Sequence, residues 1–289
     1  MSLPNKSAVV TGVSSGIGRA IAKSLTDAGW RVFGSVRRER DAIEAAAALG
    51  GNFSPLIFDV TDEAGIARGA DAVRAALKGE TLGALVNNAG IAVGGPVACL
   101  NMDDLKRQID INVYGPIRAI KAFAPLLGAD RVQNGPPGRI VNMSSVAGKI
   151  ASPFMSPYAM SKHALEAMSE SLRREMVMHG IDVVIVGPGA IRTPIWAKAD
   201  EIDFEQYRRT DYFSDLERMK GMMQSFGEQG LEAGAVGKLV LGILMSAKPK
   251  TRYAILKNKF MMWTLPNLLP KRMVDSFVAK RFGLKPRTA

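Results

Sequence analysis

The chain has 289 residues, of which 47% are hydrophobic and 22% are charged, so it is long enough for one large α/β domain or two small ones. Its single cysteine, Cys99, excludes an internal disulfide and favours a reducing, cytoplasmic location. No apolar run approaches the roughly 18 residues of a membrane-spanning helix, and we expect neither a signal peptide nor a metal site.

Short apolar runs alternate with segments of helical periodicity along most of the chain. The runs predict strands at 7–12, 30–36, 53–60, 82–90, 138–145, 181–189 and 251–256. The segments between them predict helices at 17–28, 40–49, 62–77, 103–127, 157–179 and 230–247. Strands that are apolar on both faces and alternate with helices are typical of a parallel sheet covered on both sides. The sequence therefore predicts an α/β fold with a single doubly wound, Rossmann-type parallel sheet.

After Pro188 the regular pattern lapses for about forty residues. Aromatic and methionine residues stand among charges here, namely Trp196, Phe204, Tyr207, Tyr212, Phe213, Met219, Met222, Met223 and Phe226. Loops of this length are often functional, so the segment is either a lid over something apolar or a pair of amphipathic helices packed on the body. We expect a catalytic domain over 1–250 with the lid at 190–229, and a C-terminal extension at 251–289 packed on or appended to it.

The positive charge is concentrated at the end of the chain. The whole chain carries +11, but residues 248–289 contain a single acid, Asp275, among many lysines and arginines. The nearly neutral remainder argues against a nucleic-acid surface. The apolar run at 260–270, which two prolines interrupt, leaves two interpretations open. Residues 257–289 make a peripheral contact with an anionic membrane, or the run packs on the enzyme's own core or on a sister subunit.

The stretch "TGVSSGIG", residues 11–18, follows the first predicted strand and opens the first helix. Gly12 permits a tight turn, Gly16 permits close approach of a backbone, and Gly18 permits packing of the helix on the sheet. Free amides at such a helix start bind a pyrophosphate. The stretch therefore predicts a dinucleotide site that includes Gly12, Ser14, Ser15, Gly16, Ile17 and Gly18.

The end of the second predicted strand reads "SVRRER". An acid at this place binds the ribose hydroxyls of NAD, whereas a base accommodates the 2′-phosphate of NADP. Residues 32–38 contain no Asp or Glu, and Arg37 and Arg38 carry planar, always charged donors that suit a phosphate. The sequence therefore favours NADP(H) over NAD(H), although a surface arginine pair ahead of a helix is common.

Tyr158 and Lys162 lie four apart in "SPYAMSKHALEAM", residues 156–168, inside a predicted helix. Residues at this spacing are neighbours on a helix, so the lysine charge acts on the phenol. Taken alone, the pair fits an ordinary amphipathic helix with a solvated lysine as well as it fits a proton-transfer pair.

Several motifs together resemble the short-chain dehydrogenase/reductase family, in the family's order, over residues 7 to about 250. They are "TGVSSGIG", "NNAG" at 87–90, Asn112 in "INVYG", Ser144 in "VNMSS", "YAMSK" at 158–162 and "PGAIRTP" at 188–194. The resemblance favours the proton-transfer interpretation and implies the catalytic residues Asn112, Ser144, Tyr158 and Lys162. It also implies cofactor contacts from Asp59 and Val60 at the adenine, from Asn88, Ala89, Gly90, Pro188 and Gly189, and from Ile191 and Thr193 at the nicotinamide end.

In the mechanism that the resemblance implies, Ser144 hydrogen-bonds the reacting oxygen and Tyr158 passes the proton. Lys162 favours the phenolate by its charge and grips the nicotinamide ribose, while Asn112 steadies a water between Lys162 and solvent. No metal is expected to take part.

The final segment, from "TRYAIL" to "AKRF", resembles the retinol and hydroxysteroid dehydrogenase branch. That similarity implies an NADP(H)-dependent oxidoreductase acting on an alcohol or ketone of an apolar, steroid- or retinoid-like compound. The resemblance to the short-chain dehydrogenase/reductase family also implies a homodimer or homotetramer, in which the helices at 103–127 and 157–179 pair across a two-fold axis. The alternatives are a cofactor-binding sensor and a membrane or partner adaptor, both without turnover.

Overall fold

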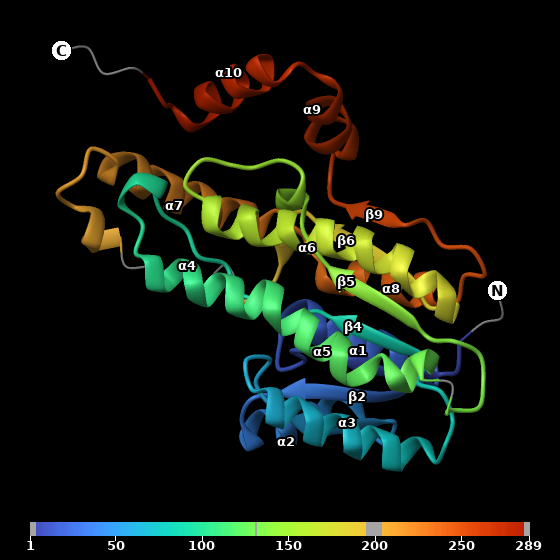
Figure 1. The fold of residues 1–289 in the computed structure, drawn as a ribbon. Coiled ribbons are helices and arrows are strands. Elements are labelled where there is room, and N and C mark those ends of the chain that lie inside the picture. Colours follow the sequence, from blue (N-terminus) through green and yellow to red (C-terminus); the bar gives the residue numbers. More distant parts are fainter. Residues whose placement is uncertain (1–3, 131, 195–203, 286–289) are drawn as a thin grey trace.

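Within residues 4–130, 132–194 and 204–285, which the computed structural model describes, seven parallel strands form one sheet in the order β3-β2-β1-β4-β5-β6-β9 (Figure 1). The strands are β1 Ser7–Val10, β2 Arg31–Val36, β3 Phe53–Ile57, β4 Ala84–Asn87, β5 Arg139–Met143, β6 Asp182–Pro188 and β9 Arg252–Ile255. Every neighbouring pair is parallel. The predicted doubly wound sheet is confirmed.

Helices cover both faces of the sheet because alternate strand residues point to opposite sides and both sides are apolar. In β1, Val10 joins a core shared with α1 Gly16–Asp27, α2 Glu39–Leu49 and α8 Ala233–Leu244. Its neighbour Val9 joins the other core. That core is shared with α3 Glu63–Leu77, α5 Gly115–Phe123 and α6 Ser156–Glu175.

The helix predicted over 103–127 is divided in the structure. It consists of α4 Met102–Ile109, a π-helical turn η2 Asp110–Tyr114, and α5, followed by the short turn η3 Pro125–Ala129. A π turn widens the helix by one residue and is frequently found at functional sites. Here the widened turn contains Asn112, which is fully buried. Helix α6 continues into the short turn η5 Met176–His179, close to the predicted end at 179.

The strand order reverses between β1 and β4, because the chain leaves β1 toward β2 and β3 and returns to β4. In open α/β sheets, ligands bind beyond the carboxyl ends of the strands at such a switch point. Six of the predicted site segments follow strand ends at this edge. They are 11–18 after β1, 37–38 after β2, 59–60 after β3, 88–90 after β4, Ser144 after β5 and 189–193 after β6.

The segment after Pro188, for which a lid and a pair of amphipathic helices were both open, contains regular structure. A short pair of strands, β7 Ile191–Arg192 and β8 Leu231–Glu232, brackets it, with η7 Phe204–Tyr207 and the 16-residue helix α7 Phe213–Glu228 between them. Tyr207, Leu216 and Met219 are buried against Phe154. Residues 195–203, with Trp196, lie outside the described residues, as do the side chains of Phe204, Met222, Met223 and Phe226.

Strand β9 lies within the range 251–289 that we expected as an extension, yet it is the edge strand of the sheet beside β6. After it the chain forms η8 Phe260–Thr264, α9 Leu265–Leu268 and α10 Lys271–Phe282, which run above α7 in Figure 1. Phe282 and Leu284 pack on the cluster of Tyr207 and Leu216. The short turns η1 Val97–Cys99 and η4 Val146–Gly148 complete the elements described. Over those residues, no helix has the length and apolar character needed to cross a bilayer.

Candidate active site

The glycine turn after β1 is shaped by residues without side chains. Gly12 and Gly16 adopt left-handed conformations with φ of 72° and 58°, which cost glycine little. A Cβ on Gly18 would overlap the carbonyl oxygen of Gly12 and the amide of Asn88. The backbone N–H of Gly12 donates to Ser35 Oγ at 3.0 Å, a contact that the sequence did not indicate. The turn is therefore narrow and closed to larger residues.

The amino terminus of α1 is open to an anion. Its N-cap residue, Ser15, is exposed and makes no side-chain capping bond, and the first turn contains no acidic residue. Ser14 and Ile17 are half-buried on either side of it. The first amides of a helix and its dipole both favour negative charge. This terminus and the narrow glycine turn fit the pyrophosphate of a dinucleotide.

Asn88 joins the ends of β1 and β4. Its Nδ2 donates to the carbonyls of Thr11 and Gly12 at 2.9 and 3.1 Å. In return, Thr11 Oγ1 accepts from the backbone N–H groups of Asn88 and Ala89 at 2.9 and 3.0 Å. Asn88 therefore holds the glycine turn in place through its side chain. Thr11, which begins the glycine motif, is the partner that the sequence analysis did not single out.

The two arginines after β2 differ in their surroundings. Arg38 makes two hydrogen bonds to Asp41, from Nε at 2.9 Å and from Nη2 at 2.8 Å. The Arg37 side chain is 67% exposed, and its Nη1 lies 4.0 Å from Asp59 Oδ2. Asp59 also accepts from the backbone and hydroxyl of Thr61. Arg38 is thus already paired with the carboxylate of Asp41, whereas Arg37 is exposed and lies near Asp59, just after the end of β3.

Val60 and Gly90 lie close to the segment of η2 and the start of α5. Val60 is buried, and a Cβ on Gly115 would lie 2.9 Å from its Cγ2. A Cβ on Gly90 would lie 3.1 Å from Asn112 Oδ1. The side chain of Asn112 is occupied by protein partners. Its Nδ2 donates to Ile91 O at 2.9 Å and to Ser161 Oγ at 3.1 Å, and its Oδ1 accepts from Ile91 N at 2.9 Å.

The two serines after β5 point to different places. Tyr158 lies beside Ser145, the neighbour of the predicted Ser144, and Ser145 lowers the pKa of the Tyr158 phenol. Ser144 Oγ is buried and has no hydrogen-bond partner among the described residues. A Cβ on Gly148 would lie 2.6 Å from that oxygen, so Ser144 faces the turn at 146–148. Ser145 is therefore the serine beside Tyr158, whereas the hydroxyl of the predicted Ser144 faces Gly148.

Ser145 is held at the start of η4. It adopts an extended conformation and accepts from Ala147 N at 3.1 Å, as an N-cap residue does. Its hydroxyl also lies 3.4 Å from the carbonyl of Pro188. Burial raises the pKa of Tyr158, and the hydrogen bond with Ser145 partly offsets this. The phenol of the cofactor-free protein is therefore protonated at neutral pH.

Lys162 lies one helical turn after Tyr158 and is buried. Its Nζ donates to Met143 O at 2.8 Å and lies 5.8 Å from the centroid of the Tyr158 ring. Burial lowers the pKa of Lys162 to about 8, while the nearby carboxylate of Glu166 raises it. An ammonium beside a phenol favours the phenolate. The pair is thus placed for proton transfer at the carboxyl edge of the sheet.

The segment after β6 closes over the glycine turn. A Cβ on Gly16 would lie 3.3 Å from both Cβ and Cγ2 of Thr193. Gly189 N donates to Ile255 O at 2.9 Å, which ties the segment to the end of β9. Ile191 is buried. The predicted residues after β1 and β6 are therefore neighbours in space.

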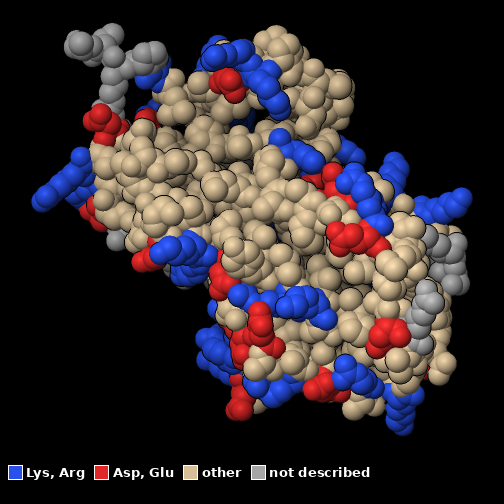
Figure 2. Space-filling model, in the orientation of Figure 1, with Lys and Arg blue, Asp and Glu red and all other residues tan. Residues whose placement is uncertain are grey.

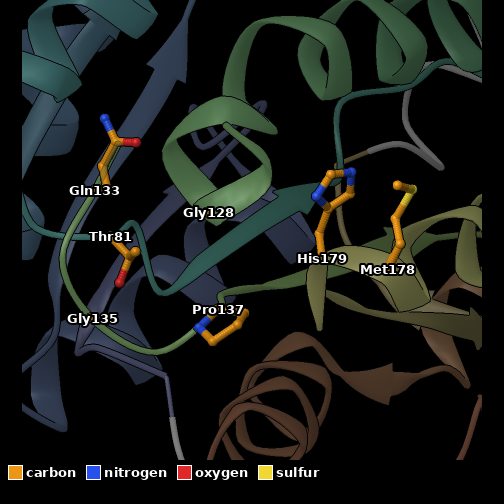
Figure 3. A pocket seen from close by; sticks show the side chains of 7 residues that line it. All are labelled: Thr81, Gly128, Gln133, Gly135, Pro137, Met178 and His179. Atoms are coloured by element: carbon orange, nitrogen blue, oxygen red, sulfur yellow. The ribbon is translucent and has the colours of Figure 1, made fainter. Parts of the chain in front are cut away.

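A separate hollow of about 360 Å³ opens at the opposite edge of the sheet (Figure 3). It is lined by Thr81, Gly128, Gln133, Gly135, Pro137, Met178 and His179. These residues precede β4, β5 and β6, so they lie at the amino ends of the strands. The hollow is not part of the site built at the carboxyl ends.

Comparisons with known proteins agree with this geometry. A family model described as short chain dehydrogenase matches residues 6–203. The chain is 35% identical to an NADPH-dependent 3-dehydrocapnine reductase of Ornithobacterium rhinotracheale, over 94% of this chain and 96% of that protein. It is 32% identical to human retinol dehydrogenase 5, over 95% and 89%. The crystal structure of a short-chain dehydrogenase from Streptomyces avermitilis superimposes with a TM-score of 0.73 at 28% identity, over 97% and 96%.

Proposed function

Because the chain belongs to the short-chain dehydrogenase/reductase family, and is thus an oxidoreductase that acts on CH–OH groups with a nicotinamide cofactor, we propose a more specific activity. It is an NADP(H)-dependent enzyme that interconverts an alcohol and a carbonyl of an apolar, steroid- or retinoid-like compound. The observation that carries this proposal is the contact of Tyr158 with Ser145, one helical turn from the buried Lys162.

In this proposal Tyr158 and Ser145 hold the reacting oxygen of the substrate, and Tyr158 exchanges a proton with it. The bound cofactor supplies or accepts the hydride. In the reducing direction Tyr158 starts protonated, as burial favours, and gives its proton to the oxygen. The ammonium of Lys162 then stabilises the phenolate that remains. Asn112 keeps the 88–91 segment beside α6, since its amide bonds Ile91 and Ser161.

The preference for NADP(H) rests on Arg37. Its guanidinium is exposed beside the end of β2, and a planar fork suits a phosphate. Arg38 contributes less, because Asp41 already occupies it. A relative with 35% identity carries NADPH in its name. Titration of the protein with NADPH and with NADH, followed by cofactor fluorescence, tests this preference. Tighter binding of NADH would contradict it.

The apolar substrate is supported by the segment at 190–229, which we propose as the lid. Its buried Tyr207, Leu216 and Met219 pack with Phe154, four residues ahead of Tyr158. A relative with 32% identity is named a retinol dehydrogenase. The test is a panel of steroids, retinoids, short ketones and sugars with both oxidised and reduced NADP. Turnover confined to sugars or short ketones would contradict an apolar substrate, and a complete lack of turnover would favour the sensor or adaptor.

We also propose that this cytoplasmic enzyme touches anionic membranes through 257–289. Large apolar side chains are exposed there, namely Phe260, Met261, Met262, Leu268, Met273 and Phe277. Figure 2 shows basic side chains over α10 beside a surface without charges over α9. Such a combination suits an interfacial contact with anionic lipid.

Sedimentation with anionic and with neutral vesicles tests the contact. We expect binding to anionic vesicles that weakens with salt and is reduced in Lys271→Glu/Arg272→Glu. The matched control is Arg68→Glu/Arg74→Glu, on α3. Equal recovery in the supernatant with both kinds of vesicle would mean that the apolar side chains pack on a second subunit instead.

We propose a homodimer or homotetramer formed through α4, α5 and α6, which light scattering in solution tests.

A further inference from the structure

Arg252, the first residue of β9, is far in sequence from two parts of the proposed site and contacts both. We propose that Arg252 is a positioning residue, which fixes the segment carrying Ser145 against the turn of α6 that follows Lys162, and that Trp263 holds its guanidinium in place. The inference rests on the proposed catalytic roles of Ser145 and Tyr158, and does not depend on which cofactor or substrate is used.

The guanidinium of Arg252 binds both parts at once. Its Nε lies 2.9 Å from Glu166 Oε2 and its Nη2 lies 2.8 Å from Glu166 Oε1, so the pair is bidentate. The same Nη2 donates to the carbonyl oxygen of Ser145 at 3.2 Å. Glu166 lies one helical turn after Lys162, and Ser145 lies beside Tyr158. One side chain therefore spans the serine segment and the catalytic helix.

The surrounding backbone is shaped to admit this arrangement. A Cβ on Gly187 would lie 2.6 Å from Arg252 Nη2, so the guanidinium lies directly on the backbone of β6. A Cβ on Gly148 would lie 3.0 Å from Glu166 Cγ and Oε1. Two glycines thus leave the space that the ion pair fills. A guanidinium fork in a fitted space constrains orientation as well as distance.

The buried charge of Glu166 makes the pair mutually dependent. The Glu166 side chain is 2% exposed and that of Arg252 is 17% exposed. Lys149 Nζ lies 3.7 Å from Glu166 Oε2, beyond hydrogen-bond distance. Removing Arg252 would therefore leave a buried carboxylate without its hydrogen-bonded cation, which is strongly unfavourable. Glu166 and the carbonyl of Ser145 would then have to find other partners, and the serine segment would shift.

Trp263 covers the open side of the guanidinium. The ring of Trp263, in η8, lies 4.2 Å from Arg252 Cζ, within the range of a cation–π contact. The C-terminal segment therefore contributes to the support of the site, although it lies outside the sheet. Removal of the ring would free the guanidinium to move without removing its charge.

The test compares Arg252→Gln with Arg252→Lys. The maximal rate of each variant is divided by the concentration of cofactor-binding sites, so that kcat refers to folded protein alone. We expect Arg252→Gln to lower kcat by about 10-fold to 100-fold, because a small misplacement of catalytic groups is costly, while the cofactor Kd changes less than about threefold. Arg252→Lys should recover part of the loss, since lysine restores the charge without the fork. The matched control is Arg74→Gln on α3, an exposed arginine paired with Asp71, which should keep full kcat.

Two further variants show that the effect passes through Ser145 and Trp263. If Arg252 acts by placing Ser145, Arg252→Gln should add little to the loss caused by Ser145→Ala, so the two effects are not additive. Trp263→Ala should lower kcat and Trp263→Phe should restore most of it. Additive losses, or a normalised kcat within twofold of the wild type in Arg252→Gln, would overturn the proposal.

A readout without turnover separates this inference from the proposed function. The difference in tyrosinate absorbance between each protein and its Tyr158→Phe form reports the titration of Tyr158 in the cofactor-free state. Because the hydrogen bond from Ser145 lowers the pKa of Tyr158, Arg252→Gln should raise that pKa. An unchanged titration would overturn the positioning role even if the enzyme is active. A shifted titration in a protein without turnover would support the positioning role and contradict the proposed function alone.

Discussion

Ser145, and not its neighbour Ser144, lies beside Tyr158 and lowers the pKa of its phenol. The two serines follow β5 directly, and successive side chains of an extended backbone point to opposite sides. The hydroxyl of Ser144 therefore faces Gly148 on the other side of the segment. Two residues of the same type in adjacent positions thus have different chemical surroundings.

Substitution of each serine by alanine separates their roles. Ser145→Ala should lower kcat by a factor on the order of 10² or more, since it removes a donor aimed at the reacting oxygen. Ser144→Ala should change kcat less than about threefold and should not destabilise the fold, because its hydroxyl is buried without a partner among the described residues. Steady-state kinetics and thermal unfolding of both variants test this pair. The reverse ranking would restore Ser144 as the catalytic serine.

Tyr158→Phe should abolish most of the proton transfer and leave cofactor binding nearly intact. We expect kcat to fall by a factor on the order of 10² or more, the usual contribution of a positioned acid or base. Tyr114→Phe, at an exposed tyrosine of η2, is the matched control and should keep wild-type kcat. Turnover with a substrate of the wild type, together with cofactor titration, gives both quantities. Undiminished turnover in Tyr158→Phe would exclude this mechanism.

Arg37 and Arg38 should contribute unequally to cofactor choice. Arg37→Ala should weaken NADPH by about tenfold or more and leave NADH almost unchanged, because it removes a charged donor to the extra phosphate. Arg38→Ala should weaken NADPH less, since Arg38 is already bound to Asp41. The measurement is the Kd of each reduced cofactor for the two variants. Equal losses would mean that Arg38 leaves Asp41 when the phosphate binds.

The titration of Lys162 should make stability depend on pH. Burial lowers its pKa to about 8 from the ordinary 10.5, so above pH 8 the folded protein loses this proton before the unfolded chain does. Stability rises with pH wherever the unfolded state binds more protons. Between pH 8 and 10.5 the free energy of unfolding of the cofactor-free wild type should therefore rise relative to Lys162→Met, by up to roughly 3 kcal/mol. Urea unfolding across this range measures the difference, and a constant difference would contradict the lowered pKa.

The strands of the sheet and the helices between them were predictable, because the alternation of apolar runs with segments of helical periodicity can be read directly from the sequence. The helix at 213–228 fits one of the two interpretations of the segment after Pro188, but the sequence did not decide between them. Charged residues interrupt its apolar positions, and its burial depends on Phe154. The π turn at 110–114 was also hidden, since the helical pattern continues through it. The conformation of both segments depends on tertiary contacts, which the periodicity of the sequence does not report.

Within the site, residue types were easier to predict than partners. The contact of Arg38 with Asp41 was open to prediction, since the two lie three apart at a helix start. The orientation of Ser144 and Ser145 depends on how the backbone leaves β5, which a pair of identical letters does not reveal. The pair of Arg252 and Glu166 spans 86 positions, and it forms only when β9 joins the sheet beside β6.

Asn112 pairs with Ile91 as one peptide group pairs with another, donating a hydrogen bond to its carbonyl and accepting one from its N–H. The Asn112 side chain thereby satisfies the backbone N–H and carbonyl of Ile91, as a neighbouring strand would in a sheet. At neutral pH an amide of this length has both a donor and an acceptor at one end, whereas aspartate has acceptors alone and leucine has neither. The substitution Asn112→Asp keeps the shape but places a carboxylate oxygen against the carbonyl oxygen of Ile91 in the buried interior. Position 112 therefore requires an amide and does not tolerate a side chain that is only similar in shape.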